Sequence, residues 1–257
     1  MDEQHVKQAR SFGAVAVEYE RARPSYPPEA ARWLVEAAPG RRVIDLAAGT
    51  GKLTRVLVGL DYDVIAVEPL SGMREQLEAA VPGIPVLEGT AEAIPAADAS
   101  ADAVLVAQAF HWFDAAAALD EIARVLRPGG VLGMLWNLRD DSVDWMQPLN
   151  RVLRRPGDLV SMSRDLAREE AGSHPQFSGI ERREFPNPLP YTPELLVTWA
   201  RSTSRIAVLP EEEREQVAGD ILELTRTHPD LRGRDTFELP LVTVCVRARR
   251  AWAATAV

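Results

Sequence analysis

Short apolar runs alternate with helix-like patterns through the first half of the chain. The apolar runs lie at residues 42–46, 63–67, 85–87, 103–107 and 131–136. Between the first two runs, leucine and valine recur at the spacing of one helix face, at Leu53, Val56, Leu57 and Leu60. Strands that are apolar throughout are buried on both faces, as in a parallel sheet covered by helices. The pattern predicts a doubly wound α/β domain.

Two further helices are expected between these runs. One covers Ser71–Ala80, and Asp114 is placed to cap another whose apolar face includes Leu119, Ile122 and Leu126. The segment Arg127-Pro-Gly-Gly130 should end this second helix, because proline and glycine both interrupt helical hydrogen bonding. A strand over Val131–Trp136 is then expected to follow.

Beyond Trp136 the alternation becomes irregular. Helices are predicted around Trp145–Leu153, after the capping residue Thr192, and over 210–228, and strands over 181–185 and 237–247. Trp145, Tyr191 and Trp199 could line a pocket, although aromatics at helical spacing more often belong to a core. Because there is no internal repeat or low-complexity linker, we expect a single domain, 1–257. It would carry an N-terminal lid, 1–30, and helical cap insertions at 138–180 and 190–230.

Composition excludes several classes of function. The formal net charge of −9 leaves no general basic field for a phosphate backbone, so nucleic acid is not the expected partner. Cys245 is the only cysteine, which excludes an intramolecular disulfide and a multi-cysteine metal site. No acidic cluster suited to magnesium is apparent, so no metal is expected. The N-terminus lacks a signal-peptide pattern and no stretch is long enough to span a membrane, so we expect a cytoplasmic protein.

The most informative motif follows the first apolar run. It is Asp45-Leu-Ala-Ala-Gly49-Thr-Gly51, and Glu68 ends the next apolar run. A strand ending in an acid, a glycine turn, a helix and a second strand ending in an acid is how an α/β sheet holds an adenosyl cofactor. A dinucleotide motif would continue with glycine or alanine at position 54, where this chain has threonine.

Later segments make this motif part of an ordered set. The set is Asp45-x-Ala-x-Gly49-x-Gly51, Glu68, Gly89-Thr-Ala-Glu92, Gln108-Ala-Phe-His-Trp112 and Leu126-Arg-Pro-Gly-Gly130. It resembles the class I S-adenosylmethionine-dependent methyltransferases of the type 11 group. The segments Phe12-Gly13, Tyr19 and Arg23-Pro-Ser-Tyr-Pro27 resemble a small-molecule branch that includes trans-aconitate methyltransferase-like proteins. The resemblance implies a seven-stranded, mostly parallel Rossmann-like sheet whose last strand, 236–247, is antiparallel.

The resemblance also implies a set of cofactor-binding residues. They are Tyr19, Arg23, Asp45, Ala47, Gly49, Gly51, Glu68, Pro69, Met73, Ala91, Glu92 and Gln108. Asp45 would receive the cofactor's amino group, often through water, Glu68 would accept both ribose hydroxyls, and Glu92 would flank the adenine. Ala47 stands where the family usually has glycine, and one methyl group should leave binding intact. Arg23 fits a surface turn equally well, and Glu92 also fits a surface helix.

The methyl acceptor is expected to be an oxygen, carboxylate or hydroxyl, of a small acid or natural product. Residues at the edge of the fourth and fifth strands and in the lid would contact it: Tyr26, His111, Trp112, Asn137 and Arg139. His111 is the candidate general base, because histidine titrates near neutrality, although packing or shaping the substrate site is the commoner role. Two alternatives remain open, a non-catalytic cofactor-binding or partner module and an NAD-dependent oxidoreductase. The oligomeric state is not predicted.

Overall fold

The computed structural model describes residues 22–153 and 160–251. Its strands are β1 (Arg42–Leu46), β2 (Asp63–Val67), β3 (Val86–Leu87), β4 (Ala101–Ala107), β5 (Leu126–Arg139), β6 (Phe177–Pro186), β7 (Leu189–Tyr191), β8 (Phe237–Leu239) and β9 (Leu241–Arg250). Its helices are α3 (Pro28–Val35), α4 (Lys52–Gly59), α5 (Ser71–Ala80), η1 (Phe110–Trp112), α6 (Ala115–Val125), α7 (Met146–Leu153), α8 (Val160–Ser173), α9 (Pro193–Ser202), α10 (Ser204–Ala207) and α11 (Glu211–Thr227).

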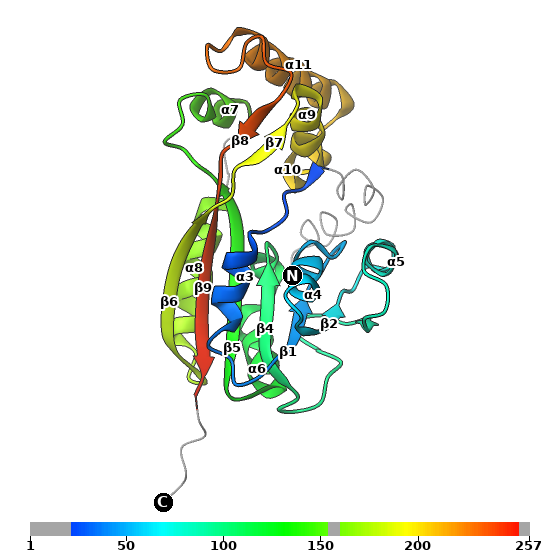
Figure 1. Ribbon diagram of the computed structural model, residues 1–257, viewed down its shortest axis with the longest axis vertical. Coiled ribbons are helices and arrows are strands. Elements are labelled where there is room, and N and C mark those ends of the chain that lie inside the picture. The colour runs from blue at the N-terminus through cyan, green and yellow to red at the C-terminus, as the bar shows by residue number, and fades with distance from the viewer. Residues whose placement is uncertain (1–21, 154–159, 252–257) are drawn as a thin grey trace, which may run out of the picture.

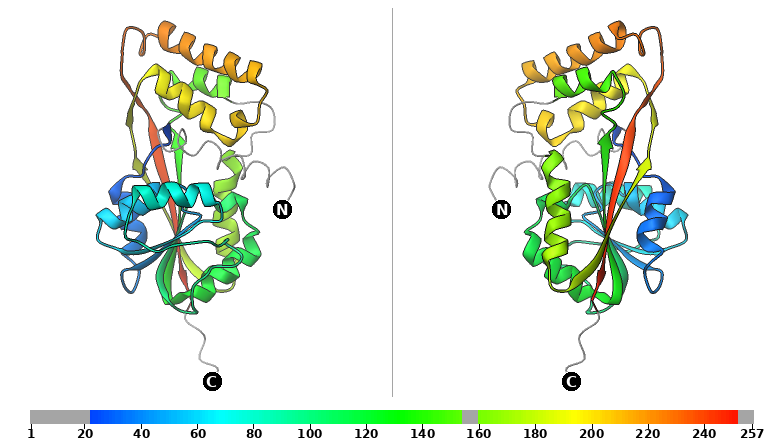
Figure 2. Two further views of the ribbon diagram at one scale, coloured as in Figure 1. Left: turned by 90° about the vertical axis from the view of Figure 1, so that its right-hand side faces the viewer. Right: turned by 90° about the vertical axis from the view of Figure 1, so that its left-hand side faces the viewer.

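A seven-stranded sheet in the order β3-β2-β1-β4-β5-β9-β6 forms the lower part of the molecule in Figure 1. Strands β1 to β5 are mutually parallel, and β9 runs antiparallel to β5. Alternate residues enter opposite cores: Val43 packs with α3 and α4, whereas Ile44 packs with α6 and α8. Figure 2 shows these helices on the two faces of the sheet. The predicted fold class is confirmed.

Strand β5 begins earlier than the sequence predicts. Leu126, expected on the preceding helix, pairs with Ala101 of β4, and α6 ends at Val125. The ladder shifts register between Ala101 and Ala103, and Gly129 takes a φ of 75°. The proline and glycines therefore form an irregular start to the strand rather than a loop before it.

The prediction of a single strand over 237–247 is wrong, because this segment forms two strands. β8 pairs with β7 in a separate two-stranded ribbon, and β9 joins the main sheet. Pro240 lies between them and lacks the N–H that a continuous ladder needs. Its carbonyl instead accepts a hydrogen bond of 2.9 Å from the backbone N–H of Asp140.

The cap consists of α7, α9, α10, α11 and the β7–β8 ribbon, above the sheet in Figure 1. Trp145, Tyr191 and Trp199 are buried together in its own apolar core. Helix α8 was not predicted, because its residues look like a polar tract within the 138–180 insertion, and it packs against α6 and β6 beside the main sheet. Residues 160–173 therefore belong to the helical layer of the sheet.

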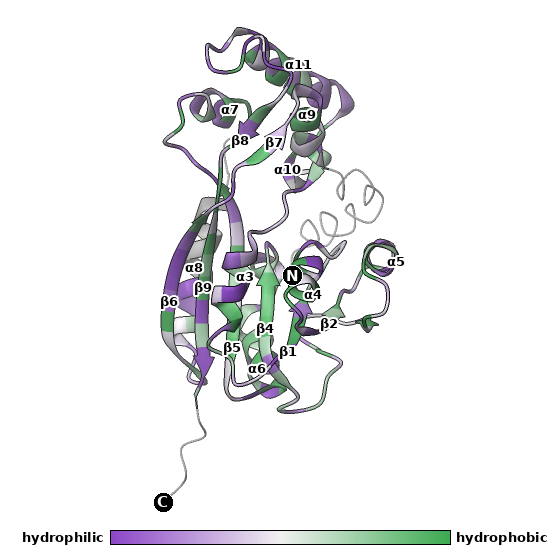
Figure 3. Cartoon of the chain, in the orientation of Figure 1, coloured by the Kyte–Doolittle hydropathy of each residue, from purple (hydrophilic) through white to green (hydrophobic). Residues whose placement is uncertain are grey.

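The outer edge of the main sheet is polar. Figure 3 shows β6 mostly hydrophilic, in contrast to the green central strands. Its run Glu181-Arg-Arg-Glu184 leaves this edge strand charged, which opposes pairing with another sheet. Within the described ranges, no helix is both long enough and apolar enough to cross a lipid bilayer.

Candidate active site

The order of strands reverses at β1, whose two neighbours are β2 and β4. In open α/β sheets, ligands bind beyond the carboxyl ends of the strands at such a reversal. The loop that follows β1 therefore lies where a ligand binds in folds of this kind.

This loop has an unusual backbone. Ala47, Gly49 and Gly51 have φ values of 56°, 58° and 84°. A Cβ at Gly51 would lie 2.9 Å from Cγ of Leu77, so the close packing of α5 requires glycine there. A Cβ at Gly49 would meet no heavy atom within 4 Å, so this side of the loop faces open space.

Asp45 lies beneath the loop and is completely buried. Its Oδ2 accepts a hydrogen bond of 2.5 Å from the hydroxyl of Thr54 in α4. Among residues 22–153 and 160–251, its Oδ1 has no hydrogen-bond partner. Burial, the largest cause, and the nearby Glu68 carboxylate together raise the pKa of Asp45 to about 7. The residue thus presents one unused acceptor in a desolvated position.

Glu68 follows β2 and reaches the same loop. Its Oε2 accepts the backbone N–H of Gly49 at 2.9 Å, and its Oε1 accepts that of Leu70 at 3.0 Å. The side chain is buried, and burial raises the pKa of Glu68 while these two backbone donors oppose the rise. A carboxylate has about four lone-pair positions, so roughly two remain for other donors.

Gln108 follows β4 and also adopts a left-handed backbone, with a φ of 58°. Its backbone N–H donates to the carbonyl of Leu135, and its side-chain amide donates to the carbonyl of Asn137 at 3.3 Å. Helix η1 follows, with His111 exposed and its ring 4.8 Å from that of Trp112. The ends of β4 and β5 are thereby joined beside the glycine loop.

Four other residues are predicted to contact the cofactor. Pro69 is exposed just after Glu68, and Met73 and Ala91 are buried. Glu92 accepts the backbone N–H of Asp114 at 3.0 Å, so its carboxylate supports the start of α6. Their assignment to the cofactor stays a prediction.

The N-terminal residues 22–27 form a strap between the cap and the main domain. The hydroxyl of Tyr191 donates to the carbonyl of Ala22 at 2.6 Å, and Arg23 donates to the carbonyl of Ser202 at 2.9 Å. At the other end, the carbonyl of Ser25 accepts hydrogen bonds from the amides of two asparagines, Asn137 and Asn187. Tyr26 is buried beside α3. Tyr19 lies outside the described residues.

Two residues predicted to bind substrate make contacts within the protein. Asn137 donates to the Ser25 carbonyl, and its Oδ1 accepts from Asn187 and from Thr243. Arg139 donates to the side chain of Asn150 in α7. Asn187, which contacts the strap, is not among the residues predicted from the sequence. Its position between Pro186 and Pro188 indicates a turn, which is the one local signal it carries.

Within the described ranges, no group of three or more His, Cys, Asp or Glu side chains is arranged to hold a metal ion. The residues that do converge are Asp45, Ala47, Gly49, Gly51 and Glu68, with Gln108 on the adjacent strand end. An unused buried acceptor, a second acid with spare lone pairs and an open glycine face suit an adenosyl ligand that carries an amino group.

Comparison with known proteins shows which family the sequence of this chain matches. Residues 44–134 match the model of a methyltransferase domain. An uncharacterized methyltransferase of Mycobacterium tuberculosis is 46% identical over 241 residues, which is 94% of this chain and 96% of that protein. An uncharacterized methyltransferase-like protein of Schizosaccharomyces pombe is 35% identical over 246 residues, 94% of this chain and 96% of its own length.

Solved structures agree on the fold. A protein of Anaeromyxobacter dehalogenans classed as a type II methyltransferase superposes with a TM-score of 0.64 and 23% identity, covering 89% of this chain and 97% of its own. At this level of identity the likeness concerns the arrangement of helices and strands.

Proposed function

The chain belongs to the class I methyltransferase family, and we propose that it transfers the methyl group of S-adenosylmethionine to a small-molecule acceptor. The proposed acceptor atom is an oxygen, of a carboxylate or a hydroxyl, in a small acid or natural product. The observation that carries the proposal is the hydrogen bond from Gly49 to Glu68, which joins the ends of β1 and β2 into one cradle.

In this proposal the cradle holds the cofactor through three features. The spare lone pairs of Glu68 accept the ribose hydroxyls, and the unused Oδ1 of Asp45 accepts the amino group, directly or through water. The open side of Gly49 lets the backbone approach the ligand. Arg23, Pro69, Met73, Ala91, Glu92 and Gln108 complete the proposed cofactor site.

S-adenosylmethionine supplies a methyl group bound to a positively charged sulfur. Because positive charge disperses during an in-line displacement, the protein's main task is to align the acceptor and exclude water. Such orientation can lower a barrier by up to ~7–11 kcal/mol in ideal systems. We assign this task to the N-terminal lid, 1–30, and to the cap, because residues 22–27 already connect the cap to the sheet.

His111 has a conditional role in this scheme. A carboxylate acceptor is already ionised at neutral pH and needs no base, whereas a hydroxyl does. Replacement His111→Gln should therefore lower turnover of phenolic acceptors more than turnover of carboxylic acids. Trp112 and Tyr26 are proposed to shape the acceptor site.

Binding of S-adenosylhomocysteine, measured by calorimetry, tests the site. Glu68→Ala removes two charge-assisted acceptors, each worth about 1.5–3 kcal/mol, so affinity should fall more than about tenfold. Glu78→Ala, which changes an exposed acid on α5, should leave the affinity unchanged. Equal affinities in the two variants would show that the cofactor binds elsewhere.

Turnover is tested separately, as formation of S-adenosylhomocysteine with a panel of small carboxylic acids and phenols. Turnover of at least one acceptor supports the proposed reaction. Cofactor binding without turnover across the whole panel would instead identify a non-catalytic binding module.

A further inference from the structure

Segments that join the cap to the main sheet meet at one cluster of polar groups. Asn137 comes from the end of β5, Asn187 from the link between β6 and β7, and Thr243 from β9. The strap contributes the carbonyl of Ser25, which accepts hydrogen bonds of 2.9 Å from Asn187 and 3.1 Å from Asn137. We call Ser25, Asn137, Asn187 and Thr243 the junction.

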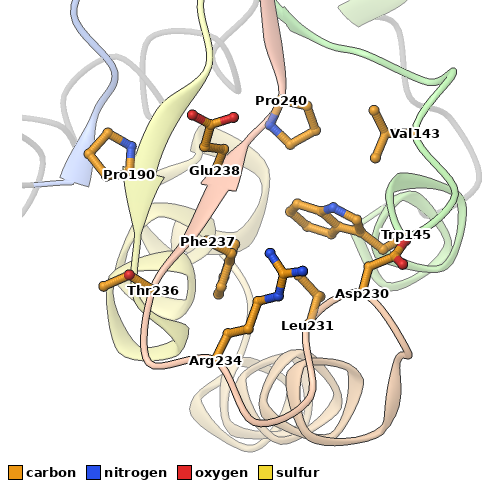
Figure 4. Close-up of a pocket in the computed structure, with 10 residues that line it drawn as sticks. All are labelled: Val143, Trp145, Pro190, Asp230, Leu231, Arg234, Thr236, Phe237, Glu238 and Pro240. Carbon is orange, nitrogen blue, oxygen red and sulfur yellow. The ribbon is translucent and has the colours of Figure 1, made fainter.

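The junction lies just below the point where the cap and the sheet separate. Strands β5 and β9 pair as far as Arg139 and Leu241. Above that pair the two chains diverge around a cavity of about 560 Å³. Val143 and Trp145, from the segment that leaves β5, line it together with Pro240, from the segment that enters β9 (Figure 4). The junction is thus near the end of the ladder that ties the cap to the sheet.

The side chain of Asn137 is held from two directions. Its Oδ1 accepts hydrogen bonds of 2.6 Å from the hydroxyl of Thr243 and 3.1 Å from the amide of Asn187. Thr243 is completely buried and lies opposite Asn137 in the β5–β9 register. A side-chain carbonyl has two lone pairs, so the acceptor capacity of Asn137 is used within the junction.

The backbone of Asn137 faces the other neighbouring strand. The backbone N–H of Gln108 donates to the carbonyl of Leu135 at 2.9 Å, and its side-chain amide donates to the carbonyl of Asn137 at 3.3 Å. Both carbonyls therefore point toward β4 and away from β9, so side chains link Asn137 to Thr243. A left-handed residue other than glycine, such as Gln108, persists only where its surroundings hold it.

We propose that Thr243 and Asn187 are positioning residues for the candidate active site. They hold the side chain of Asn137, and the backbone carbonyl of Asn137 holds Gln108 in its left-handed conformation at the end of β4. The placement of the cap and the strap is transmitted to the site along this path. The inference rests on the proposed function, in which Gln108 contacts the cofactor.

Two substitutions at Thr243 separate its hydrogen bond from its packing. Thr243→Val keeps the buried shape and loses the hydroxyl, whereas Thr243→Ser keeps the hydroxyl and loses a methyl group. A role through the hydrogen bond therefore makes valine the more harmful change, and a role through packing makes serine the more harmful one. Asn187→Asp is a second variant, because it turns a carboxylate toward the two oxygens that the amide contacts.

The readouts are hydrogen exchange of the whole ligand-free protein and its calorimetric affinity for S-adenosylhomocysteine. Exchange is followed at Gln108, Trp112 and Phe113, whose backbone N–H groups are hydrogen-bonded. Thr243→Val should quicken this exchange and weaken the affinity by about two- to tenfold, the range for one neutral hydrogen bond. Asn187→Asp should do the same, and Thr243→Ser should stay near the parent in both.

Thr225→Val is the matched control, since Thr225 is a buried threonine of α11 whose hydroxyl donates to the carbonyl of Leu222. It should change neither readout. Parent-like exchange in Thr243→Val, or a larger effect of serine than of valine, would overturn the proposal. Faster exchange with unchanged affinity would also overturn it, because the junction would then hold Gln108 without serving the site. A parent that binds no S-adenosylhomocysteine would refute the proposed function itself, and the exchange comparison, which needs no ligand, tells the two failures apart.

Discussion

The carboxylate of Glu68 accepts a hydrogen bond of 2.9 Å from the backbone N–H of Gly49. Glu68 follows β2 and Gly49 follows β1, so one side chain fixes the glycine loop to the neighbouring strand before any ligand binds. Such preorganisation reduces the entropy lost on binding. The same side chain is therefore both a structural tie and the proposed ribose acceptor.

Replacement Glu68→Gln should weaken both functions. The amide of glutamine would direct its NH₂ group toward one of the two backbone donors, Gly49 or Leu70, and leave that N–H unsatisfied. We expect a loss of about 1–3 kcal/mol in stability, seen as a lower midpoint in thermal denaturation. Glu78→Gln is the matched control on the surface of α5. An unchanged midpoint in Glu68→Gln would show that the loop is held by other contacts.

Asp45 should make the stability of the ligand-free protein depend on pH. Burial raises its pKa from 3.8 to about 7, so the folded state holds the proton more tightly than the unfolded state. The stability gained from this proton is fully present below about pH 4 and is lost as the pH rises through about 7. At ~1.4 kcal/mol per pKa unit, the loss is roughly 4 kcal/mol.

Asp45→Asn should remove this pH dependence, because the asparagine oxygen still accepts from Thr54 but carries no charge. Urea unfolding on either side of neutral pH should show the variant more stable than the parent only at the higher pH. Asp63→Asn, at an exposed position, is the control. A slope retained in Asp45→Asn would assign the pH dependence to another group.

The same pKa predicts that cofactor binding releases protons. A cationic amino group beside Oδ1 of Asp45 favours the charged carboxylate and lowers its pKa. Near neutral pH, S-adenosylhomocysteine should therefore displace a fraction of a proton from Asp45. Calorimetry in buffers of different ionisation enthalpy measures that fraction, and Asp45→Asn should reduce it to the part that Glu68 releases, since burial raises the pKa of Glu68 as well. Equal proton release by the parent and the variant would contradict contact between Asp45 and the amino group.

Ala47 occupies a backbone conformation that suits glycine, with a φ of 56°. A left-handed alanine costs ~1–2 kcal/mol, partly offset by the lower entropy of its unfolded chain. Ala47→Gly should therefore stabilise the protein by about 0.5–1 kcal/mol and leave affinity for S-adenosylhomocysteine unchanged. Ala99→Gly is the matched control, since Ala99 has a φ of 49° in a turn remote from the site. A change in cofactor affinity in Ala47→Gly alone would mean that the methyl group contacts the ligand.

The cradle could be predicted from sequence because its parts are set by local signals. Parallel pairing of β1 with β2 places Leu46 opposite Val67, so Asp45 near the end of β1, the glycines after it and Glu68 after β2 come together. The two apolar runs determine that pairing, since each must be buried on both faces. The φ values at the glycines follow from the tight turn into α4.

The cap and the strap could not be predicted in the same way. Tyr191 and Ala22 are 169 positions apart, and Asn187 and Ser25 are 162 apart, with no repeating pattern to join them. The split at Pro240 did carry a signal, because proline within an apolar run argues against a continuous central strand. For the aromatic residues of the cap, the commoner interpretation, that they belong to a core, is correct. Helical spacing indicates that a side chain is buried but does not tell whether it contacts a ligand.

Tyr191→Phe should release the strap from the cap. The variant keeps the ring in the apolar core and leaves the carbonyl of Ala22 without its donor, which costs about 1–3 kcal/mol if the carbonyl stays buried. Burial raises the pKa of Tyr191, so the hydroxyl remains a neutral donor and the effect should not vary between mildly acidic and mildly alkaline pH. Hydrogen exchange should quicken in residues 22–27 before it quickens in β1 or β4.

Tyr62→Phe, which alters a tyrosine stacked under Arg41 on the main domain, is the matched control and should leave exchange in the strap unchanged. If the strap aligns the acceptor, Tyr191→Phe should raise the KM for the acceptor or lower kcat while the affinity for S-adenosylhomocysteine stays within about twofold, because the cradle itself is intact. Faster exchange with unchanged kinetics would limit the strap to a structural role. Unchanged exchange would show that Arg23 and Asn137 hold the strap without Tyr191.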